Sequence, residues 1–181
     1  MGKIRSEIDE AARKFIQAQK IFFVASAPLA ASGHVNVSPK GLDTFRILGL
    51  TTVAYLDFNG SGVETIAHLK ENGRIVLMFC AFQGPPDILR LHGEGRAVEA
   101  HEPEFAALSA SFSDYENARS IVVVKVARVQ DSCGYGVPLF AYEGERTQLQ
   151  AWAQKRGAEG LKTYRQEKNR KSIDGLPGIS E

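Results

Sequence analysis

The chain has 181 residues, of which 44% are hydrophobic and 24% charged, and its formal net charge at pH 7 is +1. A chain of this size is expected to form one domain with a sizeable core, and a charge so close to zero gives no general attraction for nucleic acid or an anionic membrane surface. The charged N-terminus, the lack of a long apolar stretch, and two cysteines without metal or disulfide spacing predict a soluble, cytoplasmic protein.

The predicted elements begin with an amphipathic helix over residues 6–19, with Ser6 as its expected N-cap. Two β-type runs follow, residues 21–26 and 34–38, joined by a loop of hairpin length. We expect these two runs to pair as antiparallel neighbours. The second run ends in residues 38–41, SPKG, which predicts a stiff turn that carries one cation.

A third β-type run, residues 51–58, ends in NGSG and leads into a second predicted helix. Ser61 and Glu64 have the spacing of a capping box at the start of this helix, and Gly73 has the position of a helix stop. Two glycines before a helix start would let a ligand approach its unpaired N–H groups, so this junction is a candidate anion site. A simple capped helix is the alternative interpretation.

The remainder of the chain continues the same pattern. Residues 74–82 form a continuous apolar run typical of a buried strand, and Pro103 starts a short helix. Further elements are the β-type runs 88–100 and 121–129, and helical stretches around 149–152 and 161–168, before an irregular tail.

These patterns predict a mainly β protein. Six β-type runs with short connections and brief helices favour a small, closed or nearly closed antiparallel barrel over alternating βαβ units. We expect a single domain over residues 1–181, with an N-terminal helix (1–20), the barrel (21–130) and a C-terminal loop, helices and tail (131–181).

The residues that could carry chemistry give weak signals one at a time. The four histidines lack metal-ligand spacing, and no G-x-S-x-G elbow is present, so the sequence predicts no metal site and names no catalytic residue. The glycines of HGEGR (92–96) mark either a bend of the barrel or a place where a ligand or another backbone comes close.

A phosphate site emerges when these signals are combined. If antiparallel pairing brings residues 34–38 beside the end of the 51–58 run, then Ser38 and Lys40 face the helix start, and Arg90 could add a second cation. A solvated lysine remains the alternative for Lys40.

Three longer motifs resemble a known family: VNVSPKG, TTVAYLDFNGSGVETIAHLKENGRIVLMF and LRLHGEGRAVE. Their order is similar to that of the pyridoxamine 5'-phosphate oxidase-like family of FMN-binding split β-barrels, over roughly residues 10–130. The resemblance implies a six-stranded antiparallel Greek-key split barrel with flanking helices. It also implies a homodimer that binds FMN at the subunit interface.

The resemblance also assigns cofactor-binding positions. Lys40 matches a phosphate-binding lysine, Arg90 falls where an FMN-contacting glutamine is often found, and the remaining positions are Leu56, Asp57, Ser61, Gly62, Val63 and Thr65. Ser61-Gly62-Val63 lacks the two cations of the family's S-R-K run, and Val35 stands in place of an arginine. The phosphate would therefore rely on hydroxyls, backbone N–H groups and Lys40.

The function implied is that of an FMN-dependent oxidoreductase of unknown substrate, with a small-molecule electron donor such as NAD(P)H. The alternatives are a non-catalytic flavin-binding or sensor module, and a split barrel that binds F420 or haem. Candidate pocket residues are His92, Cys133 and Tyr135, each of which could instead be structural. The basic tail around residues 169–172 could approach a partner subunit's flavin or form a solvated helix face.

Overall fold

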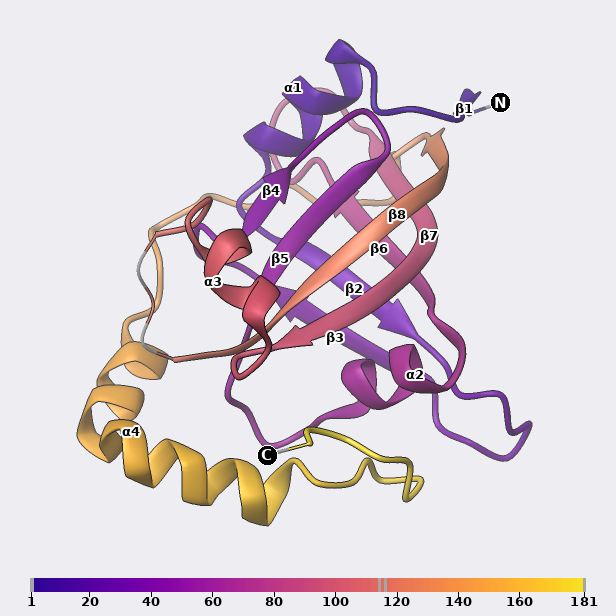
Figure 1. The fold of residues 1–181 in the computed structure, drawn as a ribbon. Helices are drawn as coiled ribbons and strands as arrows, with labels where there is room; N and C mark the ends of the chain where they lie inside the picture. The colour runs from indigo at the N-terminus through magenta and orange to yellow at the C-terminus, as the bar shows by residue number, and fades with distance from the viewer. Residues whose placement is uncertain (1, 114, 116, 181) are drawn as a thin grey trace.

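The computed structural model describes residues 2–113, 115 and 117–180. Its centre is a curled antiparallel sheet (Figure 1) with the strand order β3-β2-β6-β7-β8-β5-β4. These strands are β2 (Phe22–Ser26), β3 (Asn36–Lys40), β4 (Phe45–Ile47), β5 (Thr52–Phe58), β6 (Arg74–Cys80), β7 (Ile88–Glu99) and β8 (Ala118–Ser132). A short strand β1 (Ile4–Arg5) pairs with β8 outside this path.

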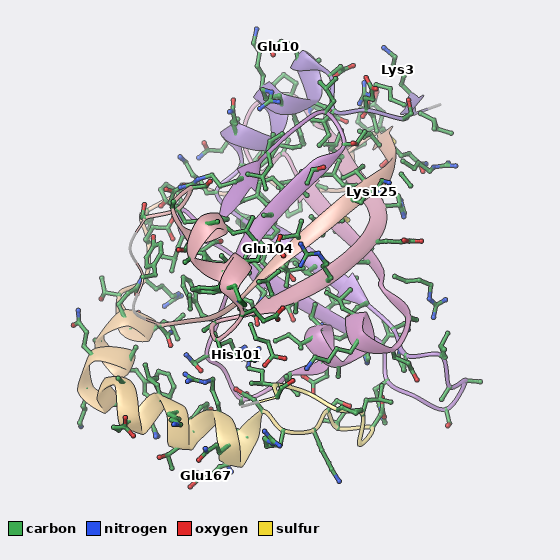
Figure 2. The ribbon with its side chains drawn as sticks, in the orientation of Figure 1. Lys3, Glu10, His101, Glu104, Lys125 and Glu167 are labelled. Atoms are coloured by element: carbon green, nitrogen blue, oxygen red, sulfur yellow. The ribbon has the colours of Figure 1, made fainter. Side chains whose placement is uncertain are left out.

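The helices are placed around the sheet. They are α1 (Glu10–Ala18), α2 (Glu64–Asn72), α3 (Pro103–Ser109) and α4 (Gln148–Lys168). Figure 1 shows α1 and α2 at opposite ends of the curled sheet, α3 beside β5 and β8, and the tail after α4 returning past α2. Charged side chains such as Glu10 on α1 and Glu167 on α4 point away from the sheet (Figure 2). None of the helices in the described part of the chain could cross a membrane.

The strand connections confirm the predicted fold class. β6, β7 and β8 follow one another as antiparallel neighbours, and β5 pairs with the far side of β8, which is a Greek-key arrangement. All six predicted β-type runs overlap strands of the sheet, and the described residues add the two short strands β1 and β4.

The core fills the inside of the curl mainly with alternate side chains of β2, β5, β6, β7 and β8. Along β2, Phe22 and Val24 are buried whereas Phe23 and Ala25 are half-buried, as expected for a strand with one face inward. The ring centroids of Phe22 and Phe79 lie 5.6 Å apart, and the Tyr55 ring packs edge-on to Phe22 at the same distance. Aromatic pairs at this spacing stabilise the fold beyond the burial of their surface, and the Phe22–Tyr55 pair joins β2 to β5 across the inside of the curl.

The predicted turn at residues 38–41 is wrong, because residues 36–40 form strand β3 and Pro39 and Lys40 lie within it. Pro39 pairs with Phe23 of β2, and within the described part of the chain no strand pairs with the other side of β3. Proline is tolerated in such an edge strand because its missing N–H is not needed by a second neighbour.

The predicted caps are partly wrong. α1 begins after Asp9 rather than at Ser6, and the Asp9 carboxylate accepts a hydrogen bond from the Ala12 N–H at 2.8 Å. The Ser61–Glu64 capping box does not form either. The N-cap of α2 is Val63, with no side-chain cap bond, because Ser61 lies two residues before it. The predicted stop is confirmed: Gly73 caps α2 in the left-handed conformation, with φ 70°.

The C-terminal region agrees with its prediction. The two predicted helical stretches lie in the two arms of α4, which is broken between them at Gly157, where φ is 64°. The tail that follows packs against its own chain, since Ile179 is buried against Val63 and Ile66 at the start of α2. The tail therefore forms one wall of the region around the α2 N-terminus.

Candidate functional site

The site lies where the curled sheet is not closed. β3 is one end of the strand path, and β4 covers β5 only as far as Tyr55, so the last residues of β5 face β3 across a split. The Lys40 ammonium on β3 binds the Asp57 carboxylate on β5 at 2.6 Å across this split. This contact brings the two strand ends side by side, as the phosphate-site interpretation requires, but across the split and not by antiparallel pairing of β3 with β5.

Asp57 is the centre of a buried ion-pair cluster. Asp57 is 1% exposed, and its carboxylate also accepts a hydrogen bond from Arg119 Nε at 2.7 Å. Burial alone would raise the pKa of Asp57, but the charges of Arg119 and then Lys40 outweigh it and lower the pKa to about 2. Asp57 is therefore ionised at neutral pH and holds both cations in place.

Arg119 reaches this cluster because the β5–β8 ladder is irregular there. Asp57 pairs with Ser120 and the next residue, Phe58, pairs with Ala118, so Arg119 is the extra residue of a bulge. No sequence motif marks Arg119 as a site residue. The available signal was Asp57 itself, because a carboxylate inside an apolar strand requires a buried cation as partner.

A small polar cavity of about 290 Å³ adjoins the cluster. Asn36, Ser38 and Lys40 face it together, because they alternate along β3 on the side that points into the curl. Asn36 connects β3 with α2. Its amide nitrogen donates to the Thr65 hydroxyl on α2 at 2.9 Å, and its amide oxygen accepts from the Ser38 hydroxyl on β3 at 3.3 Å. The other lining residues are Pro39, Asp57, Phe58, Gly60, Gly62, Glu64 and Arg119.

A larger cavity of about 1050 Å³ lies against the outer side of the split. Its strand walls are mainly apolar and include Phe23, Leu56 and Phe58, and the segment from Phe140 to Leu149 covers it. The small and large cavities share Pro39, Lys40, Phe58 and Gly60 as lining residues, so they adjoin at the ion-pair cluster. The arrangement suits an elongated ligand with a broad apolar body and a polar end.

The structure brings most of the predicted site residues together. Leu56 lines the large cavity, and the small cavity is lined by Ser38, Lys40, Asp57, Gly62 and Thr65. Three predicted residues line neither cavity. Ser61 is exposed, Val63 is buried against the tail, and Arg90 donates to the Ser132 hydroxyl at 2.7 Å. The second cation of the small cavity is thus Arg119 and not Arg90.

The other candidate pocket residues lie outside both cavities. His92 is half-buried on β7, and burial together with Arg128 and Arg90 lowers its pKa. Cys133 and Tyr135 are exposed. Asn169 is buried within its own chain, where its amide donates to the Gly60 carbonyl at 2.9 Å. The tail therefore supports the loop that borders both cavities.

Sequence comparison finds two informative matches. A family model described as pyridoxamine 5'-phosphate oxidase matches residues 8–133 of the chain. The pyridoxamine 5'-phosphate oxidase family protein ustO of Aspergillus flavus is 39% identical, over 89% of this chain and 71% of that protein.

Structural comparison finds the same architecture in solved proteins of low identity. A variant of HupZ from Group A Streptococcus has a TM-score of 0.55 at 19% identity, covering 69% of this chain and 99% of that one. A protein from Lactobacillus delbrueckii described as a putative pyridoxamine 5'-phosphate oxidase has a TM-score of 0.53 at 16% identity, covering 69% and 94%. At these identities, the matches establish a shared fold.

Proposed function

Because the chain belongs to the pyridoxamine 5'-phosphate oxidase family, we propose that it binds FMN in its two joined cavities and acts as an FMN-dependent oxidoreductase. The observation that carries this proposal is the continuity of a large apolar cavity with a small polar one at the Lys40–Asp57–Arg119 cluster. A flavin has the matching shape, with a flat ring system at one end and a polar, phosphorylated chain at the other.

The residues present fit such a cofactor. The large cavity, at about 1050 Å³, is at the upper end of the range for small-molecule sites, and Phe23, Leu56 and Phe58 offer apolar surfaces to a ring. In the small cavity, Ser38 and Lys40 supply donors for phosphate oxygens. Gly62 lines this cavity just before α2, and a Cβ there would meet the Glu64 carboxylate.

Bound FMN would supply the redox chemistry, so the protein needs no side-chain nucleophile of its own. The task of the chain is then to orient the cofactor and to keep water from its ring. Lys40 is central to this, because it lines both cavities and is held by Asp57 at 2.6 Å. We propose a small-molecule substrate and an electron donor such as NADH or NADPH.

The absorption spectrum of freshly purified protein tests the cofactor. We expect a flavin doublet, or its appearance after the protein is loaded with FMN and freed of excess ligand. A deazaflavin band, a Soret band, or no retention of added FMN would contradict the proposal. Reduction of the bound flavin by NADH or NADPH, followed by transfer to a panel of acceptors, would separate an enzyme from a non-catalytic flavin carrier.

We also propose a homodimer in which a second copy covers the outer side of the split. Val37 on edge strand β3 is 60% exposed, and Val35, which directly precedes the strand, is 71% exposed. Pro39 of the same strand lines the large cavity. An exposed edge strand is a template for pairing with another chain, and exposed apolar patches mark interaction sites. Light scattering should therefore give twice the chain mass of 19.8 kDa, and Val37→Lys should shift the protein toward monomer. A wild-type monomer at micromolar concentration would contradict this.

A further inference from the structure

The charged residues that line the small cavity cancel one another. Lys40 and Arg119 contribute two positive charges, and Asp57 and Glu64 contribute two negative ones. Asp57 is bound to both cations, at 2.6 and 2.7 Å, so these three residues together leave one positive charge. Glu64 cancels that remaining charge. The cavity is therefore formally neutral before any ligand enters.

Glu64 is held at the cavity wall by the C-terminal tail. It is the first residue of α2, and its carboxylate accepts a hydrogen bond from the Ile173 N–H at 3.3 Å. Among the described residues, no lysine or arginine forms an ion pair with Glu64. Figure 1 shows the tail passing beside α2, as this contact requires. The carboxylate is thus held at the cavity wall without a direct ion-pair partner among the described residues.

The same carboxylate also uses the positive end of α2. The first turn of a helix carries a partial positive charge from unpaired N–H groups, and an acidic side chain there is favourable. Glu64 supplies this negative charge from within the chain. An incoming phosphate would compete with Glu64 for the helix end and would be repelled by it across the cavity.

We propose that Glu64 determines the charge preference of the small cavity by weakening the binding of doubly charged phosphomonoesters relative to ligands that end in a neutral hydroxyl group. A phosphomonoester carries about −1.5 to −2 charges at pH 7, so it would make the neutral cavity strongly negative. This inference rests on the proposed flavin function, because it concerns the phosphate end of that ligand. FMN and riboflavin differ only in this phosphate and are the matched probes.

The variant Glu64→Gln tests the inference, because glutamine keeps an oxygen for the Ile173 N–H and removes the charge. Titrations that follow flavin fluorescence should give FMN binding about tenfold tighter than in wild type, the effect of removing about one unit of nearby like charge. Riboflavin affinity should not change. The control Glu94→Gln, which removes an exposed carboxylate on β7, should alter neither affinity. An unchanged ratio of FMN to riboflavin affinity in Glu64→Gln, or weaker FMN binding, would overturn the inference.

Further measurements keep the test independent of folding and of flavin. Circular dichroism and Tm establish that Glu64→Gln is folded. The variant Glu64→Ala, which also removes the hydrogen-bond acceptor, should show the same gain in FMN affinity. Inorganic phosphate should raise the Tm of Glu64→Gln more than that of wild type, because ligands that bind only the folded state stabilise it. An equal rise would overturn the inference. If neither flavin binds any of these proteins, the proposed function fails, whereas the phosphate result still decides the role of Glu64.

Discussion

Replacing Asp57 with alanine is expected to lower the free energy of unfolding by about 3–5 kcal/mol, the usual effect of removing one partner from a buried ion pair. The loss arises because Arg119, whose side chain is 6% exposed, would remain buried without its carboxylate. Lys40 would lose the contact that holds β3 to β5 across the split. Urea or guanidinium unfolding of wild type and variant measures the difference.

The control for this prediction is Asp43→Ala. Asp43 also forms an ion pair at 2.7 Å, with Arg46, but its side chain is 62% exposed. Surface pairs contribute about 0–1 kcal/mol, so this variant should unfold close to wild type. A loss at Asp57 no larger than that at Asp43 would show that the cluster does not stabilise the split.

The pH dependence of stability gives a second readout of the same cluster. The pKa of Asp57 is about 2 in the folded protein, below its ordinary value of 3.8, so the folded state binds the proton less readily than the unfolded chain does. The stabilisation is therefore fully present above about pH 4 and is lost as the pH falls toward 2. The stability difference between wild type and Asp57→Asn should shrink over that range. A difference that stays constant would contradict the assignment of the low pKa to Asp57.

Sequence reasoning was most successful where the deciding interactions are local or repeat regularly. Residues 74–82 were recognised as a strand from their apolar run, and β6 occupies most of that segment. Gly73 was recognised as a stop because a left-handed helix cap favours glycine, and its φ is 70°. β4, by contrast, has only three residues, too few to show a strand period.

Only part of the candidate site could be predicted, because only part of it depends on local or regularly repeating interactions. The pairing of β2 with β3 could be predicted from two short alternating runs, but it does not by itself place Lys40 beside β5, because β3 and β5 are not paired and meet across the split. The roles of Arg119 and Glu64 depend on contacts that no local pattern encodes. Arg119 enters through a bulge and meets Asp57 from 62 positions away, and Glu64 is positioned by Ile173, which is 109 positions away. The sequence therefore located the site but not its charge balance.

Replacing Lys40 with alanine should weaken FMN binding about tenfold to a hundredfold, since one charge-assisted hydrogen bond contributes about 1.5–3 kcal/mol. The substitution should also affect stability, because Lys40 is one of the two cations that pair with the buried Asp57 carboxylate. Lys40→Ala should therefore also unfold at lower denaturant concentration than wild type, although Arg119 still pairs with Asp57.

Lys20→Ala is the matched control for the effect of Lys40→Ala on the preference for FMN over riboflavin. Lys20 lines the large cavity, where its ammonium lies 5.6 Å from the centre of the Tyr142 ring, and it is absent from the lining of the small cavity. If Lys40 contacts the phosphate end, Lys40→Ala should reduce the preference for FMN over riboflavin, whereas Lys20→Ala should leave that preference unchanged. Equal weakening of both flavins by Lys40→Ala would mean that Lys40 acts through the shape of the split, and the phosphate would then have to bind elsewhere.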